Sequence, residues 1–269
     1  MMNTTEATRQ SAHSSQDVPA ALETRVGALL GRGSMDWTEI QGVTGDLGLL
    51  LAARFGWAAR RGPFRGIVVE GFSHPSPCLL GSYESELEQA LESLIAISPP
   101  RVVNVGSGEG WYAAGLAARL PEAQIIAYDN VPARIEDTRL TLRNNRLEHR
   151  VEVRLGTDVR QFAGDLLPGT LVVMDCEGWE HALLDPALAP GLRDCLVLVE
   201  VHDCAMEGLS DILLERFRPT HAIERIPSAI RDARDFPELD GLPDLTANLA
   251  VWEFRVEMEW FVLRPRAAS

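Results

Sequence analysis

The sequence contains no lysine: all 25 of its basic residues are arginine, they face 39 acidic residues, and the net charge is −14. No run of basic residues is longer than the pair Arg60-Arg61. Nucleic-acid binding draws much of its affinity from cationic side chains that displace counterions. We therefore predict that the chain has no nucleic-acid partner.

Long apolar runs and paired cysteines are also missing. No run approaches the ~20 apolar residues that a membrane helix needs, and the N-terminus lacks a basic and then apolar signal pattern. The four cysteines, at positions 78, 176, 195 and 204, have neither C-x-x-C spacing nor the density of a disulfide scaffold. We expect a cytoplasmic protein with reduced thiols and no membrane partner.

The chain divides into three regions by composition. Residues 1–19 are rich in Ser, Thr and Gln, which predicts a disordered tail. Residues 20–97 are expected to form an N-terminal cap region with helices at 20–30, 46–61 and 84–97 and a short strand at 67–69. Residues 98–265 are expected to form the main domain.

The main domain has the period of a βα protein. Five apolar runs end near residues 106, 129, 156, 175 and 201, with amphipathic or Ala-rich segments between them. Strands that are buried on both faces read as such runs, and right-handed crossovers would place them in one sheet. With two more strands near 221–226 and 260–263, we predict an α/β, Rossmann-like fold: a seven-stranded, mostly parallel, doubly wound sheet.

A glycine motif follows the first predicted strand. Gly106, Gly108 and Gly110 occupy alternate positions, whereas a dinucleotide pattern needs its third glycine where this chain has Trp111. Glu109 would also put a carboxylate beside a bound pyrophosphate. The spacing suits a ligand without phosphates, and S-adenosylmethionine (SAM) is the cofactor we predict. Glycine would permit positive φ and the close approach of the ligand.

The cofactor-binding residues predicted from this pattern lie at strand ends. The backbone of Gly106, Ser107 and Gly108 would contact the methionine and ribose portions of SAM. An acid at the end of the second strand accepts hydrogen bonds from ribose hydroxyls, and here it is Asp129, followed by Asn130. Thr157 and Asp158 follow the third strand and would address the adenine amino group, and Asp175 ends the fourth.

Residues 101–203 resemble a class I SAM-dependent methyltransferase. Within that group, the segment 175–180 (DCEGWE) and the segment 200–203 (EVHD) are similar to the D-x-E-G-x-E and E-x-H-D patterns of FkbM-like enzymes, and the segments 81–87 and 253–260 look similar as well. The resemblance implies an antiparallel last strand. It also implies methyl transfer from SAM to a hydroxyl or nitrogen of a small molecule or saccharide, in bacterial natural-product or surface-glycan modification.

The resemblance also assigns residues to the amino-acid end of SAM. Tyr83 and Glu84 would cover this end. Many class I enzymes begin the glycine motif with an acid where this chain has Asn104. The amide can still bond the methionine end, but without pairing its charge.

Candidate catalytic residues follow the fourth and fifth strands. In one interpretation Asp175, Glu200 and His202 bind a divalent metal such as Mg²⁺. In a second, His202 takes the proton of the acceptor, with Asp175 and Asp203 beside it, because an imidazole titrates near neutral pH. In a third, these side chains form a hydrogen-bond network that fixes the loops. The sequence leaves the three open.

Two other functions share part of this pattern. A regulator or scaffold would bind SAM without catalysis, and an NAD-dependent dehydrogenase would share the first βα unit and Asp129. We expect the acceptor pocket to be built largely from the N-terminal region and the segment after Pro227. A homo-oligomer is compatible with the sequence.

Overall fold

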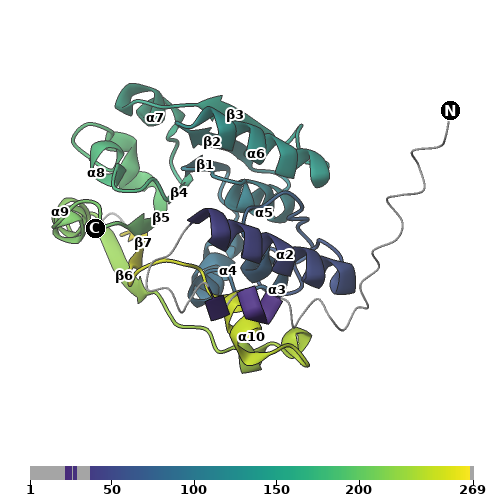
Figure 1. The fold of residues 1–269 in the computed structure, drawn as a ribbon. Coiled ribbons are helices and arrows are strands. Elements are labelled where there is room, and N and C mark those ends of the chain that lie inside the picture. The colour runs from purple at the N-terminus through teal and green to yellow at the C-terminus, as the bar shows by residue number, and fades with distance from the viewer. Residues whose placement is uncertain (1–21, 26, 29–36, 267–269) are drawn as a thin grey trace.

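A seven-stranded sheet forms the centre of the molecule in the computed structural model, which describes residues 22–25, 27–28 and 37–266 (Figure 1). The strand order is β3-β2-β1-β4-β5-β7-β6. The strands are β1 (Arg101–Val105), β2 (Gln124–Asp129), β3 (Val151–Leu155), β4 (Leu171–Met174), β5 (Leu196–Val201), β6 (His221–Pro227) and β7 (Glu259–Pro265). Strands β1 to β5 pair in parallel, and β7 is antiparallel to both β5 and β6. The predicted fold class and the antiparallel last strand are confirmed.

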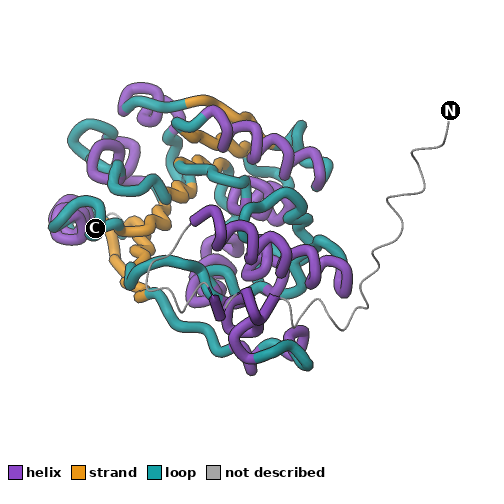
Figure 2. The backbone as a smooth tube through the Cα atoms, viewed as in Figure 1, coloured by secondary structure: helices purple, strands orange, loops and turns teal. Residues whose placement is uncertain are grey.

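Helices cover both faces of the sheet. One face carries α7 (Val159–Asp165), α8 (Glu180–Leu183) and α9 (Leu209–Phe217). Figures 1 and 2 show on the other face α2 (Trp37–Phe55), α3 (Pro75–Leu80), α4 (Glu88–Ala96), α5 (Trp111–Arg119), α6 (Pro132–Asn144) and α10 (Asp244–Val251). Short 3-10 turns span Ser85–Leu87, Pro190–Asp194, Ala233–Asp235 and Pro237–Leu239.

The alternation of side chains along each strand produces two cores. Val102 and Val173 belong to the core on the α5 side, whereas the neighbouring Val103 and Val172 belong to the core on the α7 side. Leu47 of α2 packs into the same core as Val102. The N-terminal helices therefore share a core with the sheet, and the predicted division at residues 97 and 98 stays a prediction.

The first long helix of the cap region differs from its prediction. The helix expected at 46–61 is α2, which begins at Trp37 and ends at Phe55. Gly48 lies inside it because a Cβ there would come within 2.3 Å of the Cγ atom of Pro75, so the glycine lets α3 pack closely. Gly56, at φ +80°, follows the last helical residue, which is the usual place for a terminating glycine. The predicted boundaries were wrong at both ends.

The strand predicted at Ile67–Val69 is also wrong. Only a single antiparallel bridge, between Ala58 and Val68, forms there. The side chain of Asn145, the residue after α6, accepts from the Val68 amide at 2.8 Å and donates to the Val68 carbonyl oxygen at 2.9 Å. This amide satisfies the backbone groups that a neighbouring strand would pair, so the segment stays buried without joining the sheet.

The remaining predictions concern the start of the chain, the helix at 84–97 and membrane spans. The predicted tail at 1–19 lies outside the described residues, and of the helix predicted at 20–30 the structure describes residues 22–25 and 27–28, which are helical. The helix predicted at 84–97 is present as a 3-10 turn followed by α4. None of the described helices has the length and apolar character to cross a membrane.

Candidate functional site

The backbone amides of the loop after β1 donate hydrogen bonds to acceptors within the protein. The amides of Gly106 and Ser107 both donate to the carbonyl oxygen of Tyr128 at 2.9 Å. The Gly108 amide donates to Oδ2 of Asp129 at 2.9 Å, and the Gly110 amide donates to the carbonyl oxygen of Ser107 at 2.8 Å. A loop that binds phosphate presents such groups to its ligand. This loop uses them to close on itself and on β2.

Two glycines of this loop have different roles. A Cβ on Gly106 would lie 1.6 Å from the carbonyl oxygen of Asp175, so the end of β4, and not a ligand, excludes a side chain there. This corrects our expectation that the ligand imposes glycine at 106. Gly108, at φ +53°, would place its Cβ in open space. Close approach by a ligand is therefore possible at Gly108.

The acid at the end of β2 organises the neighbouring loops. Asp129 is 9% exposed, and its two carboxylate oxygens accept from the Gly108 and Val131 amides, each at 2.9 Å. Each oxygen keeps a second lone pair for another donor. Asn130 follows it at the surface. The predicted role of Asp129 toward a ribose stays a prediction, and its place beside Gly108 supports it.

The third strand end lies next to the second. The Gly156 amide donates to the carbonyl oxygen of Asp129 at 2.6 Å, which brings Thr157 and Asp158 to the same edge of the sheet. Asp158 caps α7, because its Oδ1 accepts from the Gln161 amide at 2.8 Å. The predicted adenine contact therefore falls on a helix cap, with one carboxylate oxygen already engaged.

Asn104 lies inside β1 and not in the loop. Its side chain is 1% exposed, and Nδ2 donates to the Val173 carbonyl oxygen at 3.4 Å. Its Oδ1 has no hydrogen-bond partner among the described residues. A buried acceptor without a donor costs free energy, so Asn104 is a group that a cationic donor from a ligand would satisfy.

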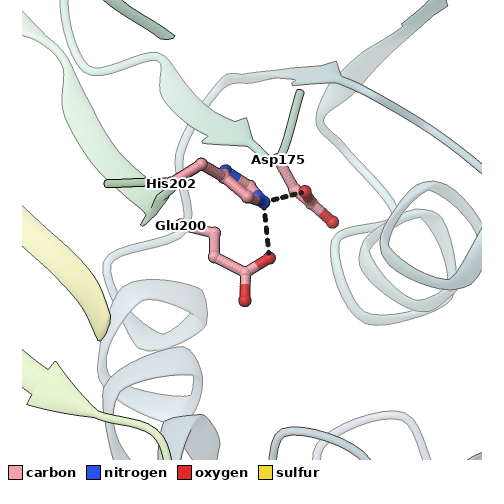
Figure 3. Close-up of side chains that lie close together, drawn as sticks. All are labelled: Asp175, Glu200 and His202. Atoms are coloured by element: carbon pink, nitrogen blue, oxygen red, sulfur yellow. Dashed lines mark ion pairs between the residues drawn. The ribbon is translucent and has the colours of Figure 1, made fainter. Parts of the chain in front are cut away.

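The predicted catalytic residues meet at the ends of β4 and β5 (Figure 3). Nε2 of His202 lies 3.6 Å from Oδ1 of Asp175 and 3.6 Å from Oε2 of Glu200. His202 is 2% exposed, and its Nδ1 is 2.8 Å from Oε1 of Glu180. Glu177, at φ +56°, brings its Oε2 to 3.6 Å from the same Nε2.

Asp203 does not join this group. Its Oδ1 accepts from the Ser210 amide at 3.0 Å, and its Oδ2 accepts from the Ser210 hydroxyl. The carboxylate is thus committed to the start of α9, and Asp203 is exposed while His202 beside it is buried. The geometry gives Asp203 a structural role, which departs from its predicted place beside the catalytic imidazole.

Glu84 joins the same edge from the cap region. It is 3% exposed, adopts φ +47°, and accepts a hydrogen bond from the Tyr112 hydroxyl. Tyr83 lies close enough to Glu84, Asp175 and Glu200 for their charges to raise the pKa of its hydroxyl, after burial, which is the larger cause. The residues that the resemblance assigned to one ligand end are therefore adjacent to the catalytic candidates.

The side chains of two arginines, 6% and 15% exposed, connect these acids, and no local pattern in the sequence marks either of them. Arg255 contacts Glu84 at 3.5 Å, Glu86 at 2.6 Å, Glu200 at 3.1 Å and Glu253 at 2.8 Å. Arg231 contacts Glu86 and, at 2.8 Å, Glu253. We call these residues, with Asp175, the acid cluster. Among them, five carboxyl groups face two guanidinium groups.

Burial and neighbouring charges raise the pKa values of several carboxyl groups in this cluster. Burial raises the pKa of Glu84 to about 8, although Arg255 opposes the rise. The pKa of Glu200 is raised to about 10, by burial first and then by the charge of Asp175, and burial raises that of Asp175 to about 6. Burial alone lowers the pKa of His202, but the hydrogen bond to Glu180 and nearby carboxylates raise it overall. The cluster is short of positive charge.

A cavity of about 950 Å³ opens beside the acid cluster. It is lined by residues from the end of β5 and from two later segments, including Val201, Arg231, Trp252, Glu253, Arg255 and Val256. The segment after Pro227 thus contributes to it as expected. Among the described residues, none before Val201 lines this cavity, so the described part of the N-terminal region does not make the expected contribution to it.

Part of the chain is similar to a known methyltransferase. No protein-family model matches the chain. The release factor glutamine methyltransferase of Deinococcus radiodurans is 39% identical over 83 residues, which make up 31% of this chain and 26% of that protein. The match thus spans about a quarter of that relative's length.

Solved structures with a similar fold are methyltransferases. An O-methyltransferase from Bacillus cereus in complex with SAH is 12% identical, with a TM-score of 0.46 over 93% of this chain and 100% of that one. A putative rRNA methylase from Clostridium thermocellum is 13% identical, with a TM-score of 0.47 over 68% of this chain and 97% of that one. One description names the methylated atom and the other names rRNA, so they do not identify the substrate here.

Proposed function

We propose that this chain is a SAM-dependent methyltransferase that acts on a hydroxyl or nitrogen of a small molecule or saccharide. The observation that carries the proposal is the pairing of a self-closed glycine loop with the acid cluster. SAM carries a sulfonium and an ammonium cation and no phosphate. Five carboxyl groups beside two arginines suit such a ligand, whereas a pyrophosphate would meet repulsion and few free amides.

The site supports an orientation for SAM. Asp129 and Asp158 lie at the ends of β2 and β3, beside Gly108, where they would address the adenosine. Glu84 and the orphan Oδ1 of Asn104 would accept from the ammonium group. The sulfonium would then lie between the glycine loop and Asp175, whose carbonyl oxygen adjoins Gly106.

The cavity supports an acceptor on the β5 side. Val201 and Asp203, on either side of His202 in sequence, both line it, and its volume suits a drug-sized or sugar-sized molecule. Methyl transfer is an in-line displacement on an activated sulfonium, so the protein chiefly positions the reactants and accepts the departing proton. We assign the activation of the acceptor, and with it the loss of that proton, to the group of Asp175, Glu200 and His202.

The FkbM-like assignment is part of the proposal. Its two motifs lie 20 residues or more apart in sequence, yet Asp175, Glu177 and Glu180 of the first contact His202 of the second. A chain that only bound SAM would have no need for this convergence beside a cavity. This convergence favours catalysis over a regulator or scaffold.

Turnover separates these functions. The full chain is incubated with methyl-labelled SAM and a panel of hydroxyl, amine and saccharide acceptors, and SAH formation is measured. We expect His202→Asn to lower turnover by about 10²- to 10⁴-fold while SAM affinity changes little, because the loss falls on acceptor chemistry. SAM binding without turnover on any acceptor would favour the regulator, and NAD binding in its place would favour a dehydrogenase.

A further inference from the structure

Three side chains at the ends of β4 and β5 present one ligand atom each to a common point. Oδ1 of Asp175, an Oε atom of Glu200 and Nε2 of His202 all lie within 4.8 Å of one another (Figure 3). We propose that Asp175, Glu200 and His202 bind a divalent first-row transition-metal ion. The site rests on this geometry and stands whether or not the chain transfers methyl groups.

The orientation of His202 is the independent observation. Oε1 of Glu180 already accepts from the Cys176 amide at 3.1 Å, and it lies 2.8 Å from Nδ1 of His202, so Nδ1 carries a hydrogen. Glu180 is fully buried, at 0% exposure. A histidine that donates through one nitrogen to a carboxylate presents the other nitrogen as a ligand, and metal-binding histidines commonly have such a partner.

Nε2 of His202, the nitrogen that is presented, has no hydrogen bond to any of the described residues. Nε2 of His202, in a side chain only 2% exposed, has Asp175 and Glu200 oxygens 3.6 Å away, too far for a hydrogen bond. A neutral imidazole would thus aim a lone pair at two carboxyl groups. A cation between the three atoms would remove that repulsion.

The spacing fits metal–ligand bonds. For bonds of about 2.0–2.2 Å, two ligand atoms 3.6 Å apart subtend roughly 110–130° at the ion. Arg255 holds the other oxygen of Glu200 at 3.1 Å, which fixes the free oxygen toward His202. The Asp175 side chain is 27% exposed and that of Glu177 is 85% exposed, so ions reach the site and Glu177 offers a fourth oxygen.

The donor set favours transition metals over magnesium. Imidazole nitrogen suits Zn²⁺, Fe²⁺ and related ions, whereas Mg²⁺ favours oxygen ligands and near-ideal octahedral geometry. We expect affinity to rise from Mg²⁺ through Mn²⁺ to Zn²⁺. If the proposed function also holds, the ion lies between the glycine loop and the cavity, where it would bind an acceptor oxygen and lower the pKa of its hydroxyl.

Direct titration tests the site without any acceptor. The full chain is stripped with a chelator and titrated with Mn²⁺, with free Mn²⁺ followed by its EPR signal. We expect one bound Mn²⁺ ion per chain. Zn²⁺ should displace this ion, and Mg²⁺ at the same concentration should not. Asp175→Asn and Glu200→Gln should each weaken binding by at least tenfold, and His202→Asn, whose amide can still donate to Glu180, should do the same.

Asp203→Asn is the matched control. It removes the same charge one residue after His202, but the Asp203 carboxylate is bonded to Ser210, so Mn²⁺ affinity should stay within twofold of wild type. Thermal unfolding establishes that each variant is folded. If His202→Asn is not folded, the comparison of Asp175→Asn with Asp203→Asn still decides whether the site binds a metal ion.

Two outcomes would overturn the site: no stoichiometric Mn²⁺ binding to wild type, or equal binding to wild type, Asp175→Asn and Glu200→Gln. SAM affinity measured on the same stripped sample keeps the two proposals apart. SAM binding without Mn²⁺ binding rejects only the metal site, and Mn²⁺ binding without SAM binding rejects only the proposed function.

Discussion

The two halves of the functional edge are built differently. On the β2 side, Gly108 and Asp129 satisfy one another and the backbone through contacts between adjacent strands. On the β5 side, Glu84, Glu200 and Arg255 come from three distant segments, and burial raises the pKa of both acids. The first half provides a shape for a ligand, and the second gathers five carboxyl groups around two arginines.

The largest effect should come from removing Arg255. This guanidinium is 15% exposed and contacts four glutamates, so Arg255→Met would leave Glu84 and Glu200 without an arginine partner, while Glu86 and Glu253 keep Arg231. We expect the free energy of unfolding to fall by about 3–5 kcal/mol, measured by denaturant titration. Arg119→Met, which breaks the exposed pair with Glu92, should cost less than about 1 kcal/mol. Equal losses for the two variants would remove the contrast between buried and surface pairs.

The pH dependence of stability follows from the same cluster. Because the pKa of Glu84 is raised from 4.5 to about 8, the folded state binds more protons than the unfolded state between these values. Stability should therefore fall as the pH rises from about 5 to 8. Glu84→Gln should flatten this part of the curve, measured by thermal unfolding across the pH range. A stability that rises over the same range in wild type would contradict the raised pKa.

Two glycines of the loop on the β2 side, Gly106 and Gly108, should respond differently to substitution. Gly106→Ala puts a Cβ against the Asp175 carbonyl oxygen at positive φ, and overpacking and left-handed strain together should cost about 2–5 kcal/mol of stability. Gly108→Ala meets open space and should cost only about 1–2 kcal/mol, while weakening SAM binding. A reversed order in chemical denaturation would show that our account of the two glycines is wrong.

The smallest effect is on cofactor affinity. Asp129→Asn keeps one acceptor oxygen but removes the charge, so SAM binding should weaken by about 1–3 kcal/mol. Asp137→Asn is the control, since Asp137 pairs with Arg134 on the surface of α6 and should leave affinity unchanged. Unchanged affinity in Asp129→Asn would place the ribose elsewhere.

The same contrast explains how far the sequence predicts the structure. The five apolar runs became β1 to β5, because a parallel strand buried on both faces has a contiguous signature. Asp129 and the glycine loop could be located for the same reason, because Asp129 ends one apolar run and the glycine loop follows another. The local pattern was sufficient wherever the stabilising contacts lie between neighbouring strands.

The arginines of the acid cluster had no such signature. Arg255 lies outside every helix and strand, and nothing near it in sequence distinguishes a buried arginine from a surface one. Its contacts with Glu84 and Glu200 span 171 and 55 residues, so they exist only after the chain has folded. Similarly, Ile67–Val69 has the composition of a strand, but Asn145 takes the place of its partner.

Titration calorimetry of the wild-type chain with SAM, SAH and NAD tests the central claim most directly. The closed glycine loop and the acid cluster predict that SAM and SAH bind with one site per chain and that SAM, which carries the sulfonium charge, loses affinity as salt rises. NAD should give no heat of binding. Binding of NAD with no binding of SAM would contradict the account.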